Sequence, residues 1–71
     1  MTGEEARGRV TEIRSALDRA MRALSVPGPD WGTASLEMAD ACDTARELTR
    51  ELAAEDFRAR RDRGRSQDGD R

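Results

Sequence analysis

The segment Val26-Pro-Gly-Pro-Asp-Trp-Gly32 divides this chain of 71 residues into two stretches that each carry a helical pattern. Proline pushes the residue before it out of helical geometry, and glycine permits a reversal of the chain. The first helix is therefore expected to end at about Ser25, and a second helix is expected to begin after the segment. The sequence thus predicts a turn over residues 26–32.

Apolar residues on both sides of the turn recur at steps that alternate between three and four residues. Such steps keep a stripe on one side of an α-helix, where a second helix can cover it. The predicted fold is all-α, an antiparallel, coiled-coil-like two-helix hairpin with helices over residues 4–25 and 33–61. The stripes are Ala6, Val10, Ile13, Leu17, Ala20 and Leu24 in the first helix, and Met38, Ala41, Ala45, Leu48 and Leu52 in the second.

Both helices carry signals for their first turns. Thr2 and Glu5 have the spacing of a capping box, in which each side chain satisfies a free amide of the first turn. Thr33 or Ser35 is expected to cap the second helix, because hydroxyl side chains accept hydrogen bonds from free amides.

A hairpin of this size has little apolar surface to bury. Only 35% of the residues are hydrophobic, and 39% are charged. At roughly 25 cal/mol per Å² of apolar area, an alanine-rich contact barely offsets the entropy lost in ordering two helices. We therefore expect a homodimer that forms a four-helix bundle, or binding to a larger protein. After Ala59 the apolar residues stop, so residues 1–61 are predicted to form one domain and residues 62–71 a disordered polar tail.

The composition argues against several classes of function. The chain has no histidine, tyrosine or lysine, and no glycine-rich phosphate loop, so we expect no enzymatic activity, no cofactor and no metal site. With a net charge of −2, the chain lacks the overall positive charge that is typical of proteins that bind nucleic acid or anionic membranes. The single cysteine, Cys42, is expected to be a small buried side chain beside Ala41, and it fits a reducing compartment. No signal-peptide pattern or membrane span occurs, so a cytoplasmic location is expected. The exclusive use of arginine as the basic residue is typical of a GC-rich genome, such as an actinobacterial one.

Several apolar residues lie off the main stripes and are candidates for binding a partner. Trp31, in the turn, either anchors a partner or folds back to cap the hairpin near Leu24. Phe57 either lies in an intermolecular contact or packs at the open end of the hairpin beside Val10 and Ala6. The full set of predicted partner-binding residues is Trp31, Leu36, Ala39, Ala53 and Phe57.

Charged residues form two further candidate surfaces. An acidic face of the second helix either docks a basic partner or is only the solvated side of an amphipathic helix. An arginine cluster near the C-terminus either contacts a phosphate backbone or keeps the tail soluble. The acidic residues are Glu37, Asp40, Asp43, Glu47 and Glu51, and the basic ones are Arg58, Arg60, Arg61, Arg63 and Arg65.

Two functions are consistent with these features of the sequence. The leading hypothesis is a non-catalytic protein–protein interaction module that acts as an accessory or regulatory subunit of a larger protein. The alternative is a nucleic-acid-associated regulator, such as an antitoxin-like or transcription-associated dimer, that uses the arginine cluster.

Overall fold

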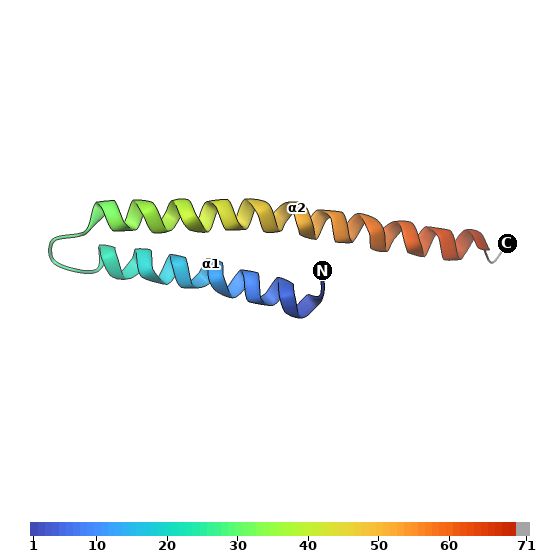
Figure 1. Ribbon diagram of the computed structural model, residues 1–71, viewed down its shortest axis with the longest axis horizontal. Coiled ribbons are helices and arrows are strands. Elements are labelled where there is room, and N and C mark those ends of the chain that lie inside the picture. Colours follow the sequence, from blue (N-terminus) through green and yellow to red (C-terminus); the bar gives the residue numbers. More distant parts are fainter. Residues whose placement is uncertain (70–71) are drawn as a thin grey trace.

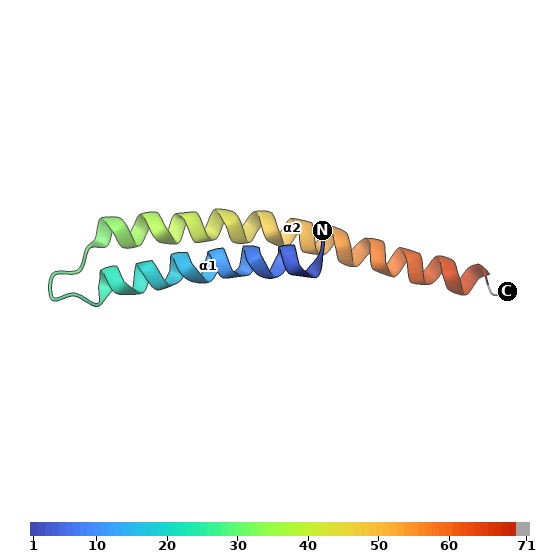
Figure 2. The same cartoon turned by 60° about the horizontal axis from the view of Figure 1, so that its bottom comes forward.

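Two α-helices, α1 (Gly3–Leu24) and α2 (Trp31–Gly69), run antiparallel and lie side by side along the length of α1 (Figure 1 and Figure 2). The structure, a computed structural model, describes the backbone of residues 1–69 and the side chains of residues 1–64. It confirms the predicted all-α hairpin, and α1 has its predicted bounds to within one residue.

Thr2 caps the first turn of α1, as the sequence predicts. Its hydroxyl oxygen accepts a hydrogen bond from the N–H of Glu5 at 3.1 Å, and the hydroxyl donates to the Glu5 carboxylate at 3.2 Å. The carboxylate therefore orients the capping hydroxyl instead of binding a free amide. Glu4 and Glu5 also place negative charge at the positive end of the helix dipole.

Asp30, rather than Thr33 or Ser35, caps α2, so the predicted cap is wrong. The Asp30 carboxylate accepts hydrogen bonds from the Thr33 hydroxyl at 2.7 Å and from the Thr33 N–H at 3.0 Å. These two bonds, the hydroxyl one foremost, lower the pKa of Asp30 below its ordinary value. The N–H of Asp30 donates to the carbonyl of Ala23 at 2.9 Å, which ties the start of α2 to the end of α1. As a result, α2 begins at Trp31, two residues earlier than predicted.

Alanine dominates the seam, meaning the residues of α1 and α2 that face each other. Among the described residues five hydrophobic side chains are buried, and four of these are alanine. Small side chains permit a close approach of two helix axes. The buried residues are Ala16 and Ala20 in α1, and Ala34, Ala41 and Leu48 in α2.

The predicted stripes and the seam share some of their residues and differ at the others by one position. Ala20, Ala41 and Leu48 are buried as predicted, but five other stripe residues are exposed. In each of these five cases the preceding residue is less exposed and faces the other helix. The reason is steric, because Ala16 lets the helices approach more closely than Leu17 would. The exposed stripe residues are Val10, Leu17 and Leu24 in α1, and Met38 and Leu52 in α2.

α2 continues past the open end of the hairpin (Figure 1), so the predicted helix end near Arg61 is wrong. We call residues 56–69 the overhang, because they follow Glu55, which pairs with Met1 at the start of the chain. Extending an existing helix costs little, and arginine is a strong helix former. An ion pair from Arg60 to Asp56 at 3.2 Å supports the first part of the overhang. Residues 62–69 are thus helical rather than disordered, and residues 70 and 71 lie outside the described residues.

Replacing Gly8 by alanine is expected to stabilise the hairpin. Gly8 lies inside α1, and a Cβ built there meets no atom within 4 Å. Because glycine is unfavourable in a helix interior, Gly8→Ala should raise the free energy of unfolding by about 0.5–1 kcal/mol. Urea denaturation followed by circular dichroism measures this gain. Gly28→Ala, in the turn, serves as the control and should gain less, since Gly28 is outside both helices. An equal or larger gain at Gly28 would contradict the explanation.

Candidate functional site

One flank of the hairpin carries six large apolar side chains that are exposed. In α1 three of them recur at intervals of seven residues, each just after a residue of the seam. In α2 two of them follow Glu37 and Glu51, which are half-buried in the seam. We call these six residues the apolar face: Val10, Leu17, Met21 and Leu24 of α1, and Met38 and Leu52 of α2.

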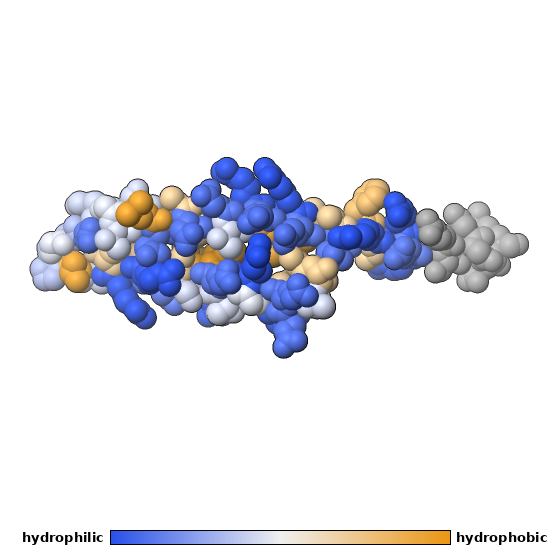
Figure 3. All heavy atoms as spheres, viewed as in Figure 1, coloured by the Kyte–Doolittle hydropathy of each residue, from blue (hydrophilic) through white to orange (hydrophobic). Residues whose placement is uncertain are grey.

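Residues on the opposite flank show that the apolar face lies on one side of the hairpin. A shallow groove there is lined by Glu12, Ser15 and Arg19 of α1, and by Asp40 and Thr44 of α2. Glu12 and Asp40 come just before seam residues of their own helices, and they share this groove. In antiparallel helices, residues just after the seam residues must therefore share the other flank. The apolar face is thus one surface formed by both helices, whereas polar residues predominate on the face in Figure 3.

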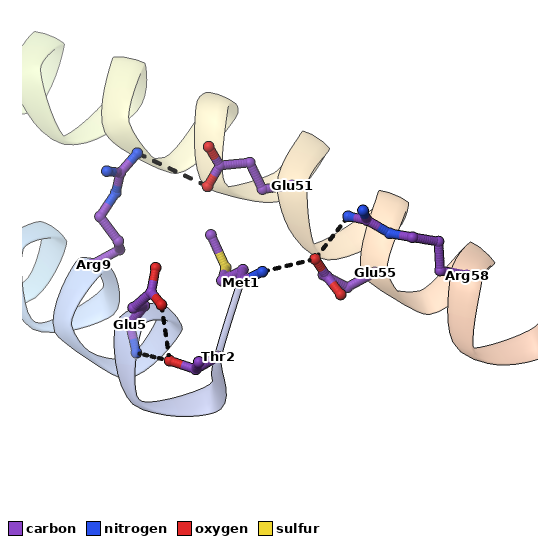
Figure 4. Close-up of polar contacts among 7 residues, drawn as sticks. All are labelled: Met1, Thr2, Glu5, Arg9, Glu51, Glu55 and Arg58. Atoms are coloured by element: carbon purple, nitrogen blue, oxygen red, sulfur yellow. Dashed lines mark hydrogen bonds and ion pairs between the residues drawn. The ribbon is translucent and has the colours of Figure 1, made fainter.

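The open end of the hairpin is held by ion pairs (Figure 4). The N-terminal ammonium of Met1 lies 3.0 Å from a carboxylate oxygen of Glu55, and Arg58 lies 2.7 Å from the same oxygen. Arg9 of α1 reaches toward Glu51 at 3.9 Å and toward Glu47 at 3.6 Å. A groove of about 560 Å³ opens between these residues. No group of side chains suited to hold a metal ion occurs there or elsewhere in the described part of the chain.

Acidification is expected to weaken the hairpin through Glu55. The hydrogen bond from the Met1 ammonium, followed by the charge of Arg58, lowers the pKa of Glu55 below its ordinary value of 4.5. A carboxylate with a depressed pKa in the folded state stabilises the fold above its ordinary pKa. That contribution is lost as the pH falls through the depressed pKa. Thermal unfolding at pH 7 and pH 3 should therefore show a smaller difference in Glu55→Gln than in the wild type. Equal differences would contradict a role for this contact.

Much of the predicted acidic face pairs with α1. Glu37 accepts a hydrogen bond from Nε of Arg19 at 2.9 Å, and Arg9 lies between Glu47 and Glu51. Glu37 and Glu51 are half-buried, so the prediction of an outer face is wrong for these two residues. Glu47, Asp40 and Asp43 are exposed. The acidic residues of α2 thus help to join the two helices.

The predicted partner-binding residues do not gather into one site. Trp31, at the start of α2, is 70% exposed, and Leu36, in the following turns, is 74% exposed. Phe57, in the overhang, is 64% exposed. Leu36 and Ala39 are about one helical turn apart, as are Ala53 and Phe57, but the two pairs lie in different parts of α2. The exposure of Trp31 rules out the cap, and that of Phe57 rules out packing inside the hairpin. A partner-binding role for these residues remains a prediction.

Cys42 is exposed, so the prediction of a buried side chain is wrong. It comes directly after Ala41, which is in the seam, and it therefore points to the edge of the apolar face. The apolar face itself was present in the sequence as part of the predicted stripes. The signal that separates it from the seam is the run of alanines beside it.

The arginine cluster lies along the overhang, and part of it is engaged within the helix. Arg58 pairs with Glu55, and Arg60 pairs with Asp56 at 3.2 Å. Nε of Arg63 donates to a backbone carbonyl one turn earlier at 3.4 Å. Arg61 is exposed, and the side chain of Arg65 lies outside the described residues.

Comparisons of the chain with protein families, with curated proteins and with solved structures find no match. No helix among the described residues has an apolar stretch long enough to cross a membrane.

Proposed function

We propose that the chain is a non-catalytic protein–protein interaction module that acts as an accessory or regulatory subunit. The apolar face is its docking surface. The observation that carries this proposal is the exposure of six large apolar side chains along one flank. Several large apolar side chains exposed on one flank of a small protein mark a site of association. The partner is a second copy, giving a four-helix bundle, or a larger protein.

Burial of side chains stabilises association through the apolar face more than through the opposite flank. Burying one large apolar side chain contributes about 1.5–3 kcal/mol. The opposite flank is occupied by ion pairs between α1 and α2, and exposed ion pairs contribute about 0–1 kcal/mol each. Association through the apolar face therefore has the larger driving force.

Met21→Glu is the variant that tests the proposal. Met21 is 66% exposed, so a charge there is tolerated by the isolated hairpin. In an interface the same charge loses its water, and association should weaken about 100-fold. Sedimentation velocity of the purified chain measures self-association, and stoichiometric co-purification from the native host measures a larger partner.

Phe57→Glu is the matched control, because Phe57 is 64% exposed but lies in the overhang. It should leave association through the apolar face within a few-fold of the wild type. Loss of association in Phe57→Glu but not in Met21→Glu would place the interface on the overhang instead. A chain that neither self-associates nor retains a partner through Met21 would refute the proposal.

The nucleic-acid alternative has weaker support. Arg58 and Arg60 are paired with carboxylates of their own helix, which reduces the positive charge offered to phosphate groups. The chain as a whole carries a net charge of −2. We therefore propose the protein-binding function alone.

A further inference from the structure

A single hairpin leaves more surface in water than a compact protein of its mass. The chain exposes 5825 Å², whereas a compact monomer of 7.9 kDa is expected to expose about 4,400 Å². Part of this excess lies on the overhang, and the rest lies along the hairpin, where a partner can bury it. The hairpin is also a single helix layer, with short dimensions of 17 and 13 Å, while stable domains have two layers. A second layer of helices on the apolar face would complete a two-layer domain.

We propose that this second layer is a second copy of the chain, docked so that α1 of each copy packs on α2 of the other. The two-fold axis then runs parallel to the helices, and every neighbouring pair of helices is antiparallel. This inference rests on the proposed function, since it names the occupant of the apolar face.

The sizes of the side chains make the two helices complementary. α1 presents only large side chains to the apolar face. The middle of α2 presents small ones on the same flank, namely Cys42, Ala45 and Thr49, between Met38 and Leu52. Large side chains opposite small ones give even packing, whereas α1 on α1 would oppose large to large. Size therefore favours α1 of one copy on α2 of the other.

The register within the hairpin shows which residues would meet. Arg19 pairs with Glu37, and the Met1 ammonium pairs with Glu55, so residues whose numbers sum to 56 lie at one level. The proposed axis keeps these levels between copies. Val10 of one copy then lies between the levels of Ala45 and Thr49 in α2 of the other copy. Leu17 lies between the levels of Met38 and Cys42.

Charge favours the same arrangement. Residues 1–25 hold five arginines and four acidic residues, whereas residues 33–57 hold two arginines and seven acidic residues. Most of these acidic residues lie in the seam or on the opposite flank, so the effect acts at a distance, but packing α2 on α2 would still bring two acidic segments closer together. Packing α1 on α2 avoids this contact on both sides of the bundle.

Arg14 and Cys42 provide the test, because their numbers sum to 56 and both are exposed at the rim of the apolar face. In the proposed dimer they face each other across the two copies. Incubation of Arg14→Cys with oxidised glutathione should therefore convert most of the chain into a covalent dimer linked between positions 14 and 42. Within one hairpin these positions lie on opposite outer edges, beyond the Cα separation of about 7 Å that a disulfide spans. Non-reducing electrophoresis and peptide mapping read out the links.

The control is Glu12→Cys, which lies on the opposite flank and should form no dimer with Cys42. Links only between like positions, 14 with 14 and 42 with 42, would overturn the arrangement. A wild-type chain that sediments as a monomer at about 100 µM would overturn the second copy as partner. The proposed function would still stand in that case if a larger protein is retained through Met21.

Discussion

Replacement of Leu48 by alanine is expected to unfold a large fraction of the chain at room temperature. Leu48 is 3% exposed and is the one large side chain buried in the seam of the described residues. Removing a buried leucine side chain costs about 2–5 kcal/mol, because the atoms lose their contacts and a cavity remains. A domain of this size rarely has more than about 3–5 kcal/mol of stability. The loss is therefore comparable to the whole stability, and helicity measured by circular dichroism should fall sharply.

Leu36→Ala is the matched control for this prediction. It makes the same chemical change in the same helix, but Leu36 is 74% exposed. Its effect should stay within about 0.5 kcal/mol. Both variants are compared at one protein concentration, because association also contributes to stability. Equal midpoints for the two variants would mean that Leu48 is not the centre of the seam.

The topology could be predicted from the sequence, because two independent signals agree. The three-and-four spacing indicates two amphipathic helices, and the Pro-Gly-Pro segment stops one helix from running into the next. Thr2 and Glu5 mark the start of α1 for the same local reason. These features depend on residues close in the sequence, and the structure confirms them.

The rotation of each helix about its axis could not be predicted in the same way. Two stripes compete in α1, and they share Ala6, Ile13 and Ala20 while differing at neighbouring positions. One stripe includes Leu17, and the other includes Ala16 in its place. Hydrophobicity favours the leucine, but the close approach of the helices favours the alanine. Which of the two residues lies in the seam depends on the distance between the two helices. The sequence of one helix alone does not determine that distance.

The same choice creates the candidate site. When alanines take the seam, the larger apolar residues are displaced together to the next position on each helix. They then form a face that belongs to both helices and that neither helix can cover. The packing of alanines in the seam thus produces both the seam and the apolar face. Large apolar residues that the three-and-four spacing assigns to the core are therefore exposed on the apolar face.

Ala16→Leu is expected to force α1 and α2 apart. Ala16 is 1% exposed and lies in the seam, so three added carbon atoms press against α2. Overpacking of this kind costs about 1–3 kcal/mol, and more where the backbone must move. Unfolding in urea should therefore shift to lower concentration, and amide hydrogens of α1 should exchange faster than those of α2, which has the longer helix.

Ala53→Leu provides the comparison, because it adds the same atoms at an exposed position of α2. Alanine and leucine differ little in helix propensity, so this variant should keep the stability of the wild type within about 0.5 kcal/mol. If Ala16→Leu were instead as stable as Ala53→Leu, the seam would have room for a larger side chain. The alanines would then not set the distance between the helices, and the displacement of Leu17 to the apolar face would need another cause.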